Sequence, residues 1–179
     1  GVAIIPEDRN KEGLCIDMSI SDNSIAGMTS KGEYKSGKLI FDDNKIEEFV
    51  KKLVDEYDIK ISDLKGNVSQ LSGGNAQKLI IARELEGNKD LLIASQPTRG
   101  VDIGAIEFIH KRILVFRKNG GSVILISSEL TEIMSLSDRI GVMYKGEIIG
   151  EVFADETNEM ELGLLMAGVT PEKEVENEA

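Results

Sequence analysis

The chain has 179 residues, of which 41% are hydrophobic, and a formal net charge of −11 at pH 7. This length and apolar content are typical of a folded protein with a sizeable core, and they exclude an intrinsically disordered chain. The acidic balance argues against a nucleic-acid partner, and the lone Cys15 excludes an internal disulfide and favours a reducing compartment.

The first third of the sequence predicts one strand followed by a mostly helical lobe. The apolar run from Val2 to Ile5, stopped by Pro6, predicts a strand. A short helix is expected over 17–26, and an amphipathic helix over 43–57, where apolar residues recur on one side. The Gly-, Ser- and Lys-rich stretch between these helices, 27–38, predicts a loop.

From residue 71 onward, predicted strands and helices alternate, which indicates an α/β domain with a parallel sheet flanked by helices. The strands are continuously apolar, which is typical of strands covered on both faces. A hairpin with its turn at Lys145–Gly146 is expected near the end of this part. The predicted elements are helix 75–86, strand 90–95, helix 102–118, strand 122–127, helix 130–136, hairpin 139–152 and helix 157–167.

The stretch "LSGGNAQK", residues 71–78, has the composition of an anion-binding helix start. Gly73 and Gly74 allow a close approach to the backbone, and Ser72 adds a hydroxyl. The first turn of a helix presents unpaired N–H groups and the positive end of its dipole. Taken alone, the motif fits an ordinary helix cap with a glycine turn equally well.

The order of several motifs extends this interpretation. "LSGGN" is followed by "LLIA", "QPTRGVD" and "VILISSEL", and this order resembles the nucleotide-binding domain of ATP-binding cassette (ABC) transporters. The variants "PEDR", "PTRGVDIGA" and "ISSEL" resemble the second such domain of simple-sugar and nucleoside importers. The resemblance implies a partial P-loop NTPase fold with a helical subdomain and a C-terminal β-hairpin. It divides the chain into the end of a core strand with the Q-loop position (1–7), the helical subdomain (8–70), the signature motif with the remaining ATPase core (71–168), and an acidic tail (169–179).

The phosphate-binding P-loop of this family is not recognisable. A near miss runs from Gly32 to Leu39, but a polar stretch precedes it, and Leu39 replaces the hydroxyl that binds Mg²⁺. The chain also opens without an initiator Met, inside what reads as a buried strand. We therefore expect the chain to be truncated after the Walker A motif and before the Walker B position.

The resemblance assigns roles to the signature and its neighbours. In the family, the signature of one domain closes over ATP held by the P-loop of the partner domain. It implies that Asp102 is at the D-loop position of this interface and that Glu7 is at the Q-loop position. ATP and Mg²⁺ are the expected cofactors of the full-length transporter, and no ligand is expected on this chain by itself. The residues expected to contact the γ-phosphate in trans are Ser72, Gly73, Gly74 and Asn75.

The chain departs from the family pattern where hydrolysis is carried out. Ser95 and Gln96 replace an Asp that places Mg²⁺ and a Glu that serves as general base. Ser128 replaces the switch histidine. A hydroxyl is a poor Mg²⁺ ligand and an amide cannot accept a proton, so no catalytic residue is expected here. The alternative is that another carboxylate, for instance Glu129, compensates for these losses.

The resemblance also implies partners and a location. The expected partners are a first nucleotide-binding domain in the same polypeptide and transmembrane permease subunits, at the cytoplasmic face of the membrane. The segment "LCIDMSISDN", 14–23, either docks on the permease or packs within the lobe. The chain by itself is expected to lack ATPase activity. It is also expected to rearrange locally or to self-associate, because the strands beside the missing P-loop strand have unpaired edges. The alternative function is that of a soluble ABC protein acting on ribosomes or DNA, which the acidic charge disfavours.

Overall fold

The computed structural model describes residues 1–29, 34–36 and 40–169. Two compact units divide the chain, Gly1–Ile124 and Leu125–Ala179, and each is described by itself. The near-miss P-loop residues Gly32, Gly37, Lys38 and Leu39, and all of the predicted acidic tail except Val169, lie outside the described residues.

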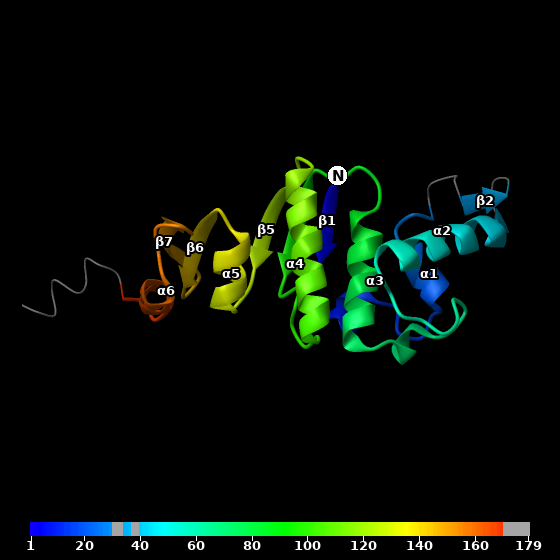
Figure 1. Cartoon of the computed structure of the whole chain (residues 1–179), viewed down its shortest axis with the longest axis horizontal. Coiled ribbons are helices and arrows are strands. Elements are labelled where there is room, and N and C mark those ends of the chain that lie inside the picture. The colour runs from blue at the N-terminus through cyan, green and yellow to red at the C-terminus, as the bar shows by residue number, and fades with distance from the viewer. Residues whose placement is uncertain (30–33, 37–39, 170–179) are drawn as a thin grey trace, which may run out of the picture. The chain divides into compact units, whose positions relative to one another are not determined.

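The order of elements confirms an α/β fold (Figure 1). The predicted helix over 17–26 is shorter in the structure, because the Ser19 hydroxyl accepts a hydrogen bond from the Asp22 N–H and fixes the helix start at Ile20.

The second unit contains α5 (Leu130–Leu136), the hairpin β6 (Arg139–Tyr144) and β7 (Glu147–Phe153), and α6 (Glu159–Met166). The first unit contains β1 (Val2–Ile5), η1 (Arg9–Gly13), α1 (Ile20–Ser24), β2 (Lys35–Ser36), β3 (Ile40–Phe41), α2 (Asp43–Glu56), η3 (Val68–Gln70), α3 (Gly73–Leu85), β4 (Leu91–Ser95) and α4 (Ile103–Lys118), and β5 (Ser122–Ile126) crosses the boundary.

The central sheet joins segments that are far apart in the sequence. Its strand order is β1-β4-β5. β1 and β4 are parallel, with a register that runs from Val2 opposite Leu91 to Ile5 opposite Ala94. The helical lobe and α3 therefore form the connection between two neighbouring strands, which is the crossover that a parallel pair requires.

Within the described residues, helices cover only one face of this sheet. Ala3 and Leu92 are fully buried, whereas Val2 and Ile4 are each 53% exposed and Ile124 is 50% exposed. α3 packs against β1, and α4 packs beside α3, so both helices shield the same side (Figure 1). The expectation that both faces of the strands are covered is therefore wrong for the part of the chain described here.

The lobe between β1 and α3 has its own small core. α2 begins at the Asp42 cap, whose carboxylate accepts from the Lys45 N–H at 3.3 Å, and Tyr34 packs on Phe49 with ring centroids 5.1 Å apart. This lobe carries the chain from the end of β1 to the start of α3, where the "LSGG" stretch lies. The core residues are Ile25, Met28, Tyr34, Ile46 and Val50.

Candidate functional site

The predicted signature residues form the start of α3. Ser72 is the N-cap residue, and its Oγ accepts from the Asn75 backbone N–H at 3.4 Å. Gly73 and Gly74 are the first two residues of a helix 13 residues long. The unpaired N–H groups of this first turn and the helix dipole give the site a local preference for an anion.

Gly74 allows the start of α3 to touch the start of α4. A β-carbon on Gly74 would lie 2.7 Å from Asp102 Oδ2 and 2.9 Å from Ala105 Cβ. Asp102 caps α4, because its Oδ1 accepts from the Ala105 N–H at 3.0 Å. The second glycine of the motif is therefore required by packing within the chain, in addition to any ligand. Gly74 of the predicted signature and Asp102, the residue predicted at the D-loop position, share this contact.

Arg9 links the segment after β1 to the turn before α4. Its Nη1 donates to the Arg99 carbonyl at 2.7 Å and its Nη2 to the Gly100 carbonyl at 3.1 Å. The Glu7 carboxylate pairs with the Arg99 guanidinium. A β-carbon on Gly73 would lie 3.0 Å from Arg9 Nη2. Arg9 is part of the "PEDR" variant, but no local sequence signal indicates that its partners lie 90 residues later.

The three positions that depart from the family pattern occur in two different units. Ser95 ends β4, and Gln96 follows it with φ of 48°, a left-handed conformation that is uncommon outside glycine. Because Ile5 pairs with Ala94 in a parallel register, Glu7 and Gln96 leave the sheet at the same edge. Ser128 belongs to the second unit, between β5 and α5.

Two broader features of the described residues bear on the kind of site. Within the described part of the chain, no group of three or more histidine, cysteine, aspartate or glutamate side chains could hold a metal ion. None of the helices within 1–29, 34–36 and 40–169 is long and apolar enough to cross a membrane.

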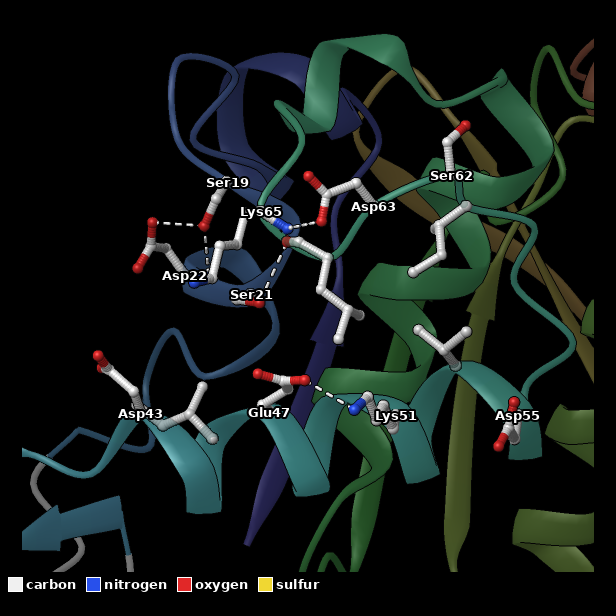
Figure 2. Close-up of a pocket in the computed structure, with 14 residues that line it drawn as sticks. Ser19, Ser21, Asp22, Asp43, Glu47, Lys51, Asp55, Ser62, Asp63 and Lys65 are labelled. Carbon is white, nitrogen blue, oxygen red and sulfur yellow. Dashed lines mark hydrogen bonds and ion pairs between the residues drawn. The ribbon is translucent and has the colours of Figure 1, made fainter.

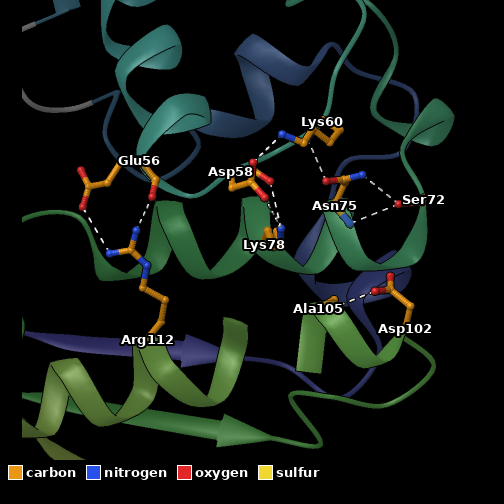
Figure 3. Close-up of polar contacts among 9 residues, drawn as sticks. All are labelled: Glu56, Asp58, Lys60, Ser72, Asn75, Lys78, Asp102, Ala105 and Arg112. Atoms are coloured by element: carbon orange, nitrogen blue, oxygen red, sulfur yellow. Dashed lines mark hydrogen bonds and ion pairs between the residues drawn. The ribbon is translucent and has the colours of Figure 1, made fainter. Parts of the chain in front are cut away.

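Polar contacts join the end of α2 to α3 and α4 (Figure 3), and the Tyr57 ring packs beside them. Arg112 on α4 donates to the Glu56 carbonyl and lies over the Tyr57 ring, 4.1 Å from its centroid. Burial raises the pKa of the Tyr57 phenol to about 12, although the Arg112 charge opposes this change. Lys78 on α3 donates to the Asp58 carbonyl at 2.9 Å. Arg112 thereby joins α4 to the end of α2, and Lys78 joins α3 to the turn that follows α2.

Asp58 gives this cluster a predicted pH dependence. Its hydrogen bond with Lys60, reinforced by Lys78, lowers the pKa of the carboxyl below its ordinary value of 3.8. A lowered pKa in the folded state stabilises the fold above the ordinary pKa, and this contribution is lost as the pH falls through the folded-state value. We expect Asp58→Asn to lower the urea midpoint at pH 7 and to have a progressively smaller effect as the pH falls below 3.8. Asparagine tolerates the left-handed backbone of Asp58, whose φ is 48°.

The control for this experiment is Asp55→Asn, an exposed acid in the last turn of α2, three residues before Asp58. Its urea midpoint should follow that of the unchanged chain at every pH. An effect of Asp58→Asn that is equally large at pH 3 and pH 7 would contradict the ionic origin of the contact.

A separate hollow of about 520 Å³ lies in the helical lobe (Figure 2). Its walls come from α1, α2 and the segment before η3. Ile46 and Leu64 give it an apolar part, while Lys51 pairs with Glu47 at 2.7 Å. The acidic residues of its lining are Asp22, Asp43, Glu47, Asp55 and Asp63.

Comparisons with known proteins give close sequence relatives. The chain is 48% identical over 170 residues to the guanosine import ATP-binding protein NupO of Bacillus subtilis (strain 168), covering 95% of the chain. It is 47% identical over 167 residues to the nucleoside import ATP-binding protein NupA of Lactococcus lactis subsp. cremoris, covering 93% of the chain. The chain spans 33% of the length of each of these two relatives. No protein-family model matches it.

Solved structures agree on the fold. The dimeric post-hydrolysis state of the ATP-binding cassette MJ0796, bound to ADP and Pi, matches with a TM-score of 0.68 at 19% identity. This match covers 86% of the chain and 62% of that cassette. A second dimeric structure of MJ0796, a bacterial ABC transporter cassette, matches with a TM-score of 0.66 over 85% of the chain and 62% of that cassette, at 20% identity. The solved structures share the fold of the chain, and its sequence relatives, which are named as import ATP-binding proteins, place it in the family of ABC nucleotide-binding domains.

Proposed function

We propose that this chain acts within the ATP-binding protein of an importer for a nucleoside or simple sugar, where its signature motif closes over ATP held by a partner nucleotide-binding domain. The observation that carries the proposal is the start of α3, where Ser72, Gly73 and Gly74 present a hydroxyl and helix N–H groups beside Asp102. A phosphate supplied from outside fits this arrangement. Two relatives named for guanosine and nucleoside import favour the nucleoside class.

We further propose that the ATP site of this domain itself hydrolyses slowly or not at all. Ser95 and Gln96 follow one another at the end of β4, where a carboxylate pair would be needed to place Mg²⁺ and polarise water. Ser128 cannot take the charged form that a histidine can. Glu129 is the residue before α5 and makes no side-chain capping hydrogen bond, so it is the alternative general base that the experiment below must exclude.

The test is made in the full-length ATP-binding protein reconstituted with its permease. Replacing the catalytic Glu of the first domain by Gln should abolish nearly all ATP turnover, because no second competent site remains. The control is Glu129→Gln, which should leave turnover close to that of the unchanged protein. Turnover above about a tenth of the unchanged rate after the first substitution would overturn the proposal.

The permease is the proposed membrane partner, with the protein held at the cytoplasmic face. Segment 14–23 is suited to both alternatives that the sequence left open, because Ile20 is 2% exposed whereas Ile16 and Met18 are 46% and 47% exposed. The buried residue packs the lobe, and the exposed residues offer apolar surface to a partner. Ile16→Ser with Met18→Ser should release the permease on size-exclusion chromatography. Retention of the complex would contradict this contact.

Self-association of the 179-residue chain is proposed on the uncovered sheet face. Val2, Ile4 and Ile124 expose apolar side chains there. Apolar surface of this kind favours association with a second chain. Sedimentation velocity should show a mass that rises with concentration, and a monodisperse monomer at all concentrations would contradict the expectation.

A further inference from the structure

The side-chain amide of Asn75 is held between two groups of the same chain. The Lys60 backbone N–H donates to Asn75 Oδ1 at 2.8 Å, and Asn75 Nδ2 donates to Ser72 Oγ at 2.9 Å (Figure 3). Only the carbonyl end of an amide accepts from an N–H, so Lys60 determines that the NH₂ end faces Ser72. The direction of the hydrogen bond to Ser72 is therefore fixed by the backbone.

This arrangement determines what the Ser72 hydroxyl can still do. Its oxygen accepts from Asn75 Nδ2 at 2.9 Å and from the Asn75 backbone N–H at 3.4 Å. A hydroxyl oxygen has two lone pairs and one proton, so two accepted hydrogen bonds leave the proton to be donated elsewhere. Ser72 is exposed, so that donation is directed to a group outside this helix start.

The Lys60 N–H is itself held in place from α3. Asp58, two residues earlier, accepts from Lys60 Nζ at 2.5 Å and from Lys78 Nζ at 3.3 Å. Lys78 lies on the same helix as Asn75, one turn further along. The turn that orients Asn75 is thus anchored to the helix on which Asn75 lies, and the Ser72 donor is set before any ligand arrives.

We propose that Asn75 is a positioning residue that acts through Ser72. It does not contact the nucleotide; its amide orients the Ser72 hydroxyl so that the proton is donated to a phosphate oxygen. This refines the sequence-based expectation, which gave Asn75 a direct contact with the γ-phosphate, and it rests on the proposed function. A donor that is already oriented needs no rearrangement as charge develops on the phosphate.

The test is a double-mutant cycle in the full-length ATP-binding protein reconstituted with its permease. Ser72→Ala and Asn75→Ala should each lower kcat/KM for ATP by about tenfold, the size expected for a hydrogen bond to a charged group. The double variant should be no worse than Ser72→Ala alone, because Asn75 has nothing left to orient. Asn75→Asp should be as damaging as Ser72→Ala, because a carboxylate accepts the Ser72 proton and reverses the bond.

Each other outcome overturns the proposal in a recognisable way. If the two alanine effects multiply to about a hundredfold in the double variant, Asn75 acts independently of Ser72, and only the positioning role fails. If Ser72→Ala leaves kcat/KM unchanged, both the positioning role and the proposed trans function of the signature fail. Far-UV circular dichroism and the melting temperature of each variant are measured in parallel. A merely structural role would change these values without producing the coupling between the two substitutions.

Discussion

Replacing Gly74 by alanine should lower the free energy of unfolding of this chain by about 1–3 kcal/mol, the usual cost of forcing extra atoms into a packed contact. The new β-carbon would lie 2.7 Å from Asp102 Oδ2 and 2.9 Å from Ala105 Cβ, so the starts of α3 and α4 must separate. Separation would also weaken the capping hydrogen bond that Asp102 Oδ1 accepts from the Ala105 N–H. Urea denaturation followed by circular dichroism measures the loss.

Gly104→Ala is the matched control for this prediction. Gly104 is also in the first turn of a helix at this contact, but its added β-carbon would meet only Asp102 Oδ1, at 3.4 Å. Alanine is favoured over glycine in helices by up to about 1 kcal/mol, so this variant should be neutral or more stable. The same loss in both variants would show that the Gly74 contact has no special importance.

Replacing Asn23 by leucine should cost about 1–3 kcal/mol of unfolding free energy, because it leaves the Cys15 N–H without its hydrogen-bond partner in a buried place. Asn23 is 1% exposed, and its side chain makes hydrogen bonds with three backbone groups. Its Oδ1 accepts from the Cys15 N–H at 2.8 Å, and its Nδ2 donates to the Cys15 and Ser19 carbonyls at 3.0 Å each. Leucine makes none of these side-chain bonds, but the Cys15 carbonyl keeps the Met18 N–H and the Ser19 carbonyl keeps the backbone N–H of residue 23, so the Cys15 N–H is the group that loses its partner.

The comparison for Asn23 is Asn88→Leu, at an exposed position after α3. Surface changes of this kind usually remain within about 0.5 kcal/mol of the original stability. A loss for Asn23→Leu that is no larger than the loss for Asn88→Leu would mean that water replaces the missing hydrogen bonds. In that case segment 15–23 would not depend on this side chain for its conformation.

Local patterns in the sequence were sufficient to predict much of the fold. The helix predicted over 102–118 is present as α4, with Ile109 and Ile113 buried and Asp102 as its N-cap. Ser72 begins α3, and the hairpin turns through Lys145 and Gly146, which both have positive φ. These features depend on residues close together in the chain, where periodicity, capping and turn chemistry act directly.

Features that join distant segments could not be predicted in this way. A continuous apolar run such as that of β4 occurs in strands covered on one face and in strands covered on both. The sequence pattern therefore could not predict that one face of this sheet is uncovered. The Arg9 bonds to the carbonyls of Arg99 and Gly100 span about 90 residues. Similarly, nothing near Asn75 in the sequence indicates that Lys60 would orient its side chain.

The most direct test of the trans function is to identify which residues of this chain lie beside trapped vanadate. Vanadate occupies the place of the γ-phosphate after hydrolysis, and ultraviolet light then cleaves the backbone at residues beside it. In the full-length protein reconstituted with its permease, trapping with MgATP should cleave this chain at Ser72, because the start of α3 closes over phosphate held by the other domain. Cleavage near Ser95 or Ser128, with Ser72 intact, would contradict the account, because the phosphate would then lie in this domain's own site.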